Sequence, residues 1–212
     1  MSVADRSTFK RRLDSLGVTV TEGSESACAE LIDEAAGDPA VGVALADEGA
    51  GSADPALRLP DRVETDPTTA ELRAAHTGVT DAELGVAAYG SVAIEADAAG
   101  TEPVSLFVDR HVVVLREADI VPDMPDAFDW LGPKARDESV DVVFATGPSA
   151  TADMGGLVHG AHGPKEVHVV LLREDDADGA ASGDIADGAA AGDDADGAAS
   201  GDDAESEVGS DE

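Results

Sequence analysis

Five residues that could serve a ligand fall in one stretch, ATGPSATADMGGLVHGAHGPKEVHVVLL, which spans residues 145–172. The stretch begins where an apolar strand should end, turns through Gly-Pro-Ser, and returns through His-Gly-Pro to another apolar strand. Glycine permits the tight turn, while hydroxyls and an imidazole can hydrogen-bond a small molecule. We therefore expect one pocket to be formed by Gly147, Ser149, Thr151, Asp153 and His162.

The expected position of this pocket follows from the strand before it. Residues 140–145 predict a central parallel strand, and α/β folds bind ligands at the carboxyl ends of such strands. A helix beginning at Thr151 would direct its free N–H groups toward an anion such as a carboxylate or phosphate. Two alternatives stay open. Gly-Pro-Ser could be only a turn that caps the helix. His162 could be only a turn residue, because a helix of about ten residues is roughly 15 Å long.

The sequence offers little for metal or cofactor chemistry. His159 and His162 are three residues apart, but no carboxylate accompanies them at ligand spacing, so we expect no metal. The single cysteine, Cys28, excludes an internal disulfide and a chain-borne iron–sulfur cluster, which takes about four thiolates; we expect it to be a buried packing residue. There is no Walker sequence, no GxSxG elbow and no Rossmann glycine triplet. We expect no cofactor, and the sequence assigns no catalytic residue.

Helices and short apolar strands alternate along the chain. Periodicity and capping signals predict helices at residues 5–16, 24–39, 67–76, 80–83, 124–137 (broken near Gly132-Pro133) and, weakly, 151–164. Apolar runs predict strands at residues 40–46, 62–66, 86–95, 103–109, 111–115, 140–149 and 166–172. Few of these strands alternate strictly between polar and apolar residues. The pattern therefore predicts an α/β fold, an open mainly parallel sheet with helices on both faces.

The charge of the chain restricts its partners. Its 212 residues include 46 acids, 13 bases and only three lysines, for a net charge of −33. Such a field repels nucleic acid and anionic membranes, so we expect neither as a partner. A lysine-poor, Asp-rich surface is typical of proteins that work in high salt, where screening weakens self-repulsion. Residues 1–173 alone hold 31 acids and all 13 bases, a net −18. This favours a halophilic host over an ordinary protein with an acidic tail.

The last 39 residues differ from the rest in composition. Residues 174–212 contain 15 acids and no base, and DDADGAASGD occurs twice, at residues 175–184 and 193–202. These repeats carry almost nothing apolar larger than alanine, so they cannot offset the entropy of ordering. We predict a folded domain at residues 1–173 and a disordered acidic tail at 174–212, which solubilises the protein or, alternatively, binds a specific partner. With no membrane-length apolar run and no signal-peptide pattern, the protein should be cytoplasmic.

Three segments together resemble the lactate utilization protein C family, the LUD domain. They are TGVTDAELGVAAYGSVAIEA, SLFVDRHVVVLREADIV and the stretch at residues 145–172, and they cover residues 77–172 in the right order. The GPS-x-TAD and HGP pieces are the most specific. The resemblance implies a fold like the ribose-phosphate isomerase and CoA-transferase group. It also implies a role in oxidising L-lactate to pyruvate beside iron–sulfur subunits encoded with it, with this chain as the cluster-free member.

Two departures from the family pattern bear on activity. Where the family reads A-E-T-G-T, this chain has Ala88 in place of the acid; where it reads T-A-D-[I/L]-E, this chain has Gly155 in place of the second acid. Acid/base or binding work by those carboxylates is therefore closed to it. The leading hypothesis is an accessory, cluster-free subunit of a lactate-oxidising system, with a pocket for a small carboxylate or phosphate. The alternative is a stand-alone small-anion or nucleotide-binding regulatory module. A divergent enzyme of CoA-transferase or isomerase type is disfavoured by the two missing acids.

Overall fold

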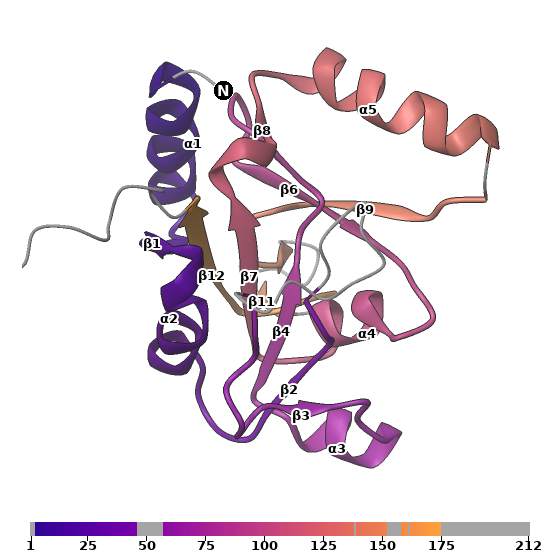
Figure 1. The fold of residues 1–212 in the computed structure, drawn as a ribbon. Coiled ribbons are helices and arrows are strands. Elements are labelled where there is room, and N and C mark those ends of the chain that lie inside the picture. The colour runs from indigo at the N-terminus through magenta and orange to yellow at the C-terminus, as the bar shows by residue number, and fades with distance from the viewer. Residues whose placement is uncertain (1–2, 46–56, 138, 152–157, 161, 175–212) are drawn as a thin grey trace, which may run out of the picture. The chain divides into compact units, whose positions relative to one another are not determined.

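The computed structural model describes residues 3–45, 57–137, 139–151, 158–160 and 162–174. All of them lie in Met1–Ala177, the first of the two units into which the chain divides, and their elements are labelled in Figure 1. The expected acidic tail and Asp153 fall outside the described residues, so both remain predictions. Within the described ranges, none of the helices combines the length and the hydrophobicity needed to cross a membrane.

A six-stranded sheet in which all strands run parallel forms the centre of the fold. Its strands, in spatial order, are β1 (Thr19–Ser24), β12 (Glu166–Arg173), β7 (Arg110–Arg116), β4 (Thr77–Asp81), β2 (Ala40–Gly42) and β3 (Glu64–Thr65). β7 and β12 pair along seven residues, from Glu166 opposite Arg110 to Leu172 opposite Arg116. Both are continuous apolar runs because both of their faces are covered. The expected mainly parallel α/β fold is confirmed.

Helices cover both faces of this sheet, as the sequence predicted. Successive side chains of β7 point to opposite faces. Val113 and Leu115 pack with α1 (Val3–Ser15) on one face, while Val112 and Val114 pack with α2 (Cys28–Ala35) on the other. All four valine and leucine side chains are at most 2% exposed, and full burial of one such side chain contributes about 1.5–3 kcal/mol. A short 3-10 turn (Glu25–Ala27) leads into α2.

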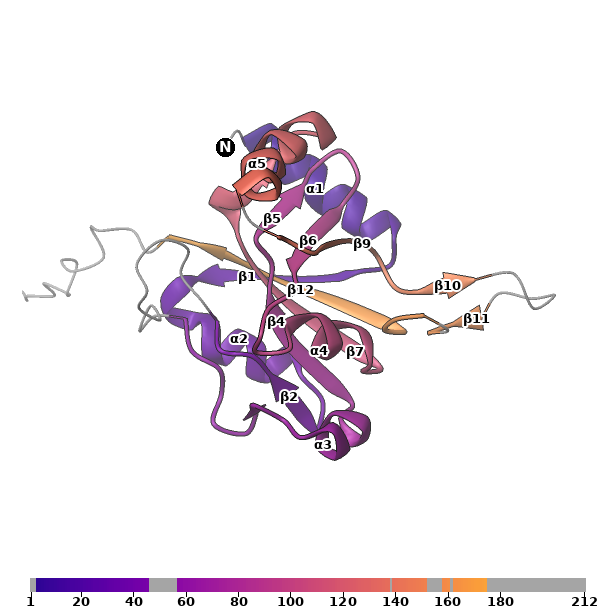
Figure 2. The same cartoon turned by 90° about the vertical axis from the view of Figure 1, so that its right-hand side faces the viewer.

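A second sheet stacks on the α1 side of the first, which the sequence analysis did not foresee (Figure 2). Its order is β8 (Ile120–Val121), β5 (Leu84–Val86), β6 (Ser91–Glu95) and β9 (Val142–Thr146), antiparallel except between β5 and β8. The strand predicted at 86–95 with an interruption at Gly90 is in fact part of the β5–β6 hairpin, whose turn includes Gly90 with φ +67°. α5 (Met124–Asp137) packs on its outer face through Ala127 and continues through Pro133 without the predicted break.

Shorter elements complete the described part of the chain. They are α3 (Thr69–Ala74), α4 (Thr101–Leu106), a 3-10 turn (Glu117–Asp119), β10 (Ala150–Thr151) and β11 (Val158–His159). α3 begins two residues later than predicted, because Thr68 and Glu71 form a reciprocal capping box. β10 and β11 pair antiparallel, with Thr151 opposite Val158, so the weak helix predicted over 151–164 is wrong at Thr151 and at Val158–His159.

Two further predictions were wrong for related reasons. Residues 103–109 were predicted as a strand, but most of that run is α4, whose Val104 packs with Val108 and Val41. Gly78 on β4 makes room for this helix, since a Cβ there would collide with the Val104 carbonyl. Thr80, predicted to cap a helical turn, lies in strand β4 opposite Val113. A short apolar run suits either a helix or a strand, and the neighbours decide between them.

Candidate ligand-binding site

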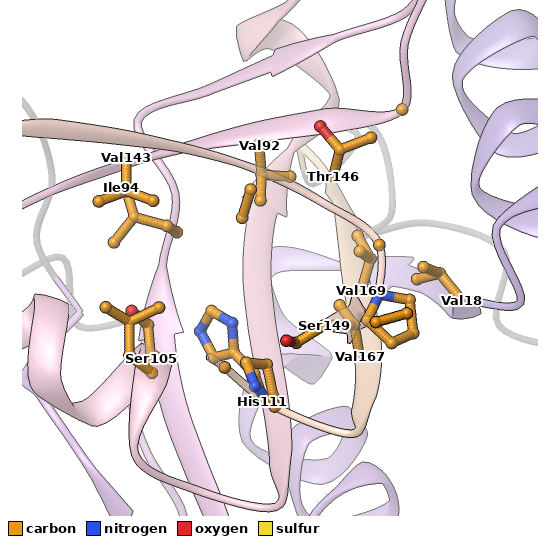
Figure 3. A pocket seen from close by; sticks show the side chains of 18 of the residues that line it. Val18, Val92, Ile94, Ser105, His111, Val143, Thr146, Ser149, Val167 and Val169 are labelled. Atoms are coloured by element: carbon orange, nitrogen blue, oxygen red, sulfur yellow. The ribbon is translucent and has the colours of Figure 1, made fainter. Parts of the chain in front are cut away.

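A cavity of about 460 Å³ lies between the two sheets, and Figure 3 shows the side chains that line it. Its floor comes from β7 and β12 of the parallel sheet through His111, Val167 and Val169, with Leu13 of α1 packed on the same face. Its roof comes from β6 and β9 of the second sheet, through Val92, Ile94 and Val143 among others. Its rim is made by residues 147–150 and 162–164. The cavity thus exists because two sheets from different parts of the sequence stack face to face.

The cavity lies beside the strand end that the sequence indicated, but for a different reason. Residues 146–150 line it directly after β9, as expected for a ligand site at a strand end. β9, however, is an edge strand of the second sheet and not a central parallel strand. Relative to the parallel sheet, His111 and Val167 are the second residues of β7 and β12, so the cavity is near the amino ends of those strands. The prediction of a carboxyl-end crevice in the parallel sheet was therefore wrong.

Ser149 joins the two turns of the rim by three hydrogen bonds. Its N–H donates to the Pro164 carbonyl at 2.9 Å, its carbonyl accepts from Gly160 N–H at 2.9 Å, and its Oγ accepts from His162 N–H at 3.3 Å. Gly147 supports the turn with φ +67°, a conformation that disfavours any residue with a Cβ. Because the Ser149 hydroxyl accepts in this arrangement, its own proton is available to a ligand.

The predicted site residues differ in whether they line the cavity. Gly147, Ser149 and His162 all line the cavity, and the chain does return so that His162 adjoins Ser149. His162 is exposed at the rim. Thr151 belongs to strand β10, so no helix begins there to bind an anion, and its side chain is outside what the structure describes.

His111, the buried imidazole of the floor, was not among the predicted site residues. Its Nε2 is 2.9 Å from Thr80 Oγ1, and that hydroxyl donates to the Asp81 carbonyl at 3.0 Å. The hydroxyl proton is thus committed, which makes Nε2 the protonated nitrogen of His111 and leaves Nδ1 as an acceptor. His111 is 2% exposed, and desolvation by burial lowers its pKa to about 3. The imidazole is therefore neutral at physiological pH.

The position of His111 in the cavity floor could be recognised only from the register of the sheet. His111 opens an apolar strand and faces the same side as Val113, but a single sequence does not show what covers that side. The site also contains hydroxyls at Ser105, which donates to the Glu102 carbonyl at 2.7 Å, and at Thr146, which is 2.6 Å from Ser91 Oγ. The floor and roof therefore combine apolar walls with a few fixed polar groups, which is the usual composition of a small-molecule site.

Apart from the histidines, the described residues around the cavity include no ionisable side chain. Among the described residues no group of three or more His, Cys, Asp or Glu side chains could hold a metal ion. Cys28 is the first residue of α2 and is buried in the core, where desolvation raises the pKa of its thiol to about 11. That environment keeps it protonated and unreactive, as the packing prediction required.

The two positions that depart from the family pattern lie apart from this cavity or outside the described residues. Ala88 lines a groove beside Arg11 and Arg12 of α1. Gly155 is not among the described residues. The absent acid at position 88 would therefore have been near two guanidinium groups, outside the enclosed space between the sheets.

Comparison with known proteins agrees with the motifs. The chain is 31% identical over 104 residues to Lactate utilization protein C of Bacillus velezensis, a match that covers 47% of this chain and 43% of that relative. The match thus spans less than half of the relative's length. The crystal structure of a DUF162 family protein from Deinococcus radiodurans has the same fold, with a TM-score of 0.61 and 21% identity over 81% of this chain and 99% of that one. The LUD domain profile matches residues 10–172, most of the described fold, and the chain therefore belongs to the LUD domain family.

Proposed function

We propose that this chain is an accessory, cluster-free subunit of an L-lactate utilization system and that the cavity between its sheets binds a small organic acid. The observation that carries the proposal is the composition of the cavity: apolar walls, a neutral imidazole acceptor at His111 and hydroxyl groups at Ser149 and Thr146. The likeness to Lactate utilization protein C supports the pathway. Since the single cysteine is buried in the core, redox centres would come from iron–sulfur partner subunits.

A short hydroxy acid matches these groups one by one. Its hydroxyl would donate to His111 Nδ1, and its methyl or methylene groups would contact the valines of the floor and roof. Its carboxylate would accept from the free Ser149 proton and from the proton that the Ser91–Thr146 pair does not use internally. A carboxylate far from water would be costly without a charged partner. It therefore belongs at the rim, near Ser149 and the exposed His162, and this favours a carboxylate over a doubly charged phosphate.

Calorimetry tests this site directly. We would titrate four acids into the full chain in molar KCl: L-lactate, D-lactate, pyruvate and propionate. Propionate lacks the hydroxyl, so its affinity relative to that of L-lactate measures what the hydroxyl contributes to binding. We expect L-lactate to bind and the His111→Asn and Ser149→Ala variants each to lose about tenfold in affinity, which is the loss expected for one hydrogen bond in an enclosed site. His76→Asn, remote from the cavity, is the control. No heat from any of the four acids, or unchanged affinity in both variants, would overturn the proposed ligand.

The partner proposal has a separate test. An accessory subunit should copurify with iron–sulfur subunits encoded beside it when the chain is isolated from cytoplasmic extract under high salt. A chain that runs alone while its neighbours assemble without it would contradict the accessory role. The alternative, a stand-alone regulatory module, draws on the absence of any carboxylate acid/base residue in the described cavity lining. If that alternative is correct, the chain should bind the ligand but should not copurify with iron–sulfur subunits.

We also propose that the host is a halophile. The net charge of −18 on residues 1–173 gives self-repulsion that molar salt would screen. Circular dichroism followed against KCl should therefore show structure being lost as salt falls toward millimolar levels. Folding that does not depend on salt would contradict the halophilic assignment.

The boundary at residue 173 can be tested independently of function. If residues 174–212 form an acidic tail that does not contribute to the core, a chain ending at Arg173 should keep its thermal midpoint in molar salt within a few degrees. A large fall in that midpoint would show that the segment stabilises the domain.

A further inference from the structure

We propose that a groove between α1 and the β5–β6 turn is a second binding site, which takes the oxyanion group of a small molecule through Arg11 and Arg12. The groove has a volume of about 400 Å³ and is lined by Thr8, Arg11, Arg12, Ser15 and Ala88. It does not depend on the ligand proposed for the cavity between the sheets. The chemistry it would recognise is a phosphate or carboxylate group.

The helix presents four polar side chains to this groove at regular spacing. Residues 8, 11, 12 and 15 follow the i, i+3, i+4, i+7 pattern that places side chains on one side of a helix. The opposite wall is the β5–β6 turn, which lies close to the helix: a Cβ at Gly90 would be 3.0 Å from the Arg12 Cβ. Both walls belong to well-packed elements, since Leu13 and Val86 on either side are at most 1% exposed. The backbone that carries the two arginines is therefore held in place by packing.

Within the part of the chain that the structure describes, no acidic side chain of the groove balances its two arginines. Arg6 and Lys10 on the same helix pair with Glu117 and Glu22. Among the described residues, in contrast, the Arg11 guanidinium donates to Thr8 Oγ1 at 3.2 Å and pairs with no acid, and Arg12 has no polar side-chain partner. No carboxylate belongs to the described lining of the groove. In a chain with 46 acids and 13 bases, two adjacent arginines without an acid form a local exception that suits an external anion.

The chemistry of the donors suits an oxyanion. Guanidinium groups present planar pairs of N–H donors that fit the oxygens of a carboxylate or phosphate, and such charge-assisted hydrogen bonds are among the stronger ones in proteins. The Thr8 hydroxyl accepts from Arg11 and keeps a proton to donate. Ser15 uses its proton on the Arg12 carbonyl at 2.7 Å and so shapes the groove without adding a donor. The walls are open enough for a small molecule to reach both arginines.

The first experiment measures anion binding to the full chain by calorimetry at fixed ionic strength. Pyrophosphate and citrate are the probes, and they separate a phosphate source from a carboxylate source. We expect at least one to bind and an Arg11→Gln/Arg12→Gln double variant to bind it roughly tenfold more weakly, as loss of charge-assisted hydrogen bonds predicts. An Arg73→Gln/Arg136→Gln double variant removes equal charge elsewhere and should bind normally. Ser149→Ala should also bind normally, because that residue lines the other site.

A matched pair at position 88 gives the sharper test. Ala88→Glu would place a carboxylate opposite the two arginines and should weaken the probe by roughly tenfold, whereas Ala88→Gln, which has the same shape without the charge, should weaken it little. Folding of both is checked by thermal midpoint. Equal binding by the two variants, undiminished binding by the double arginine variant, or no binding of either probe to the native chain would overturn the proposal.

Discussion

The floor and the rim of the cavity are built in different ways. On the floor, Leu13 and Val169 are at most 1% exposed and belong to the main core, so burial of apolar surface fixes their positions. On the rim, Gly147 and Ser149 are only partly buried, and three hydrogen bonds plus one left-handed glycine hold the turn. The floor therefore determines whether a cavity exists, and the rim determines which ligand groups it can hold. Changes on the floor should affect stability first, and changes on the rim should affect binding first.

The largest effect is expected on the floor. Leu13→Ala removes a side chain that is 1% exposed and packs between α1 and both sheets, so the free energy of unfolding should fall by about 3 kcal/mol. Leu72→Ala, at a partly buried position on α3, is the control and should cost clearly less. Urea unfolding in molar salt gives both values. Equal costs would show that the floor is no better packed than the periphery.

Next, when taken per pH unit, is the pH response of His111. The folded protein keeps this imidazole neutral down to about pH 3, while the unfolded chain binds its proton below about 6.5. The unfolded state thus takes up more protons, and stability should fall as pH drops from 6.5 toward 3, by about 1.4 kcal/mol per pH unit from this group. His111→Asn should remove that part of the slope, and Ser149→Ala, which changes no titratable group, should not. An unchanged slope in His111→Asn would mean that the imidazole is not buried as described.

A smaller loss is expected at the rim glycine. Gly147→Ala forces a Cβ onto a residue with φ +67° and brings it to 3.1 Å from the Leu16 Cβ, so stability should fall by about 1–2 kcal/mol. Gly132→Ala is the matched control: it lies inside α5, where an added Cβ would make only ordinary contacts with the Arg136 guanidinium at 3.8 and 3.9 Å, and alanine there should stabilise by roughly 0.5–1 kcal/mol. Opposite signs in the two denaturation curves are the expected outcome. A neutral Gly147→Ala would show that the rim does not need this turn.

The smallest effect on stability is expected for Ser149→Ala. Its backbone hydrogen bonds to Pro164 and Gly160 are kept, and only the contact from His162 N–H is lost, so the cost should be below about 1 kcal/mol. Ser24→Ala, which removes an exposed hydroxyl contact on β1, is the control: it measures the loss of stability from such a contact outside the cavity. If Ser149→Ala were as destabilising as Leu13→Ala, the distinction between floor and rim would fail.

Much of the scaffold could be predicted from local patterns. The apolar runs of β7 and β12 predict strands buried on both faces, and α1 and α2 show the spacing of amphipathic helices. The turn at Gly147 and Ser149 was also recognisable, because Gly-Pro-Ser after an apolar run restricts the backbone wherever it occurs. These features depend on residues that are close in sequence, and so a single sequence reports them.

The partners of each element were decided only by the tertiary structure. Residues 103–106 begin a run as apolar as a strand but belong to α4, and Gly78, on a strand distant in the sequence, leaves room for that helix. The strand ending at Thr146 joined the second sheet through β6, since backbone pairing is available to either sheet and the choice depends on contacts far away in the chain. The same holds for His111, whose role follows from Thr80 on the neighbouring strand and from a roof contributed by residues 91–95 and 142–146. The sequence by itself determined the family, the parallel sheet and the turn of the rim. Only the packing of the two sheets decided where the cavity lies and which imidazole it encloses, because burial and hydrogen-bond partners are properties of neighbours in space.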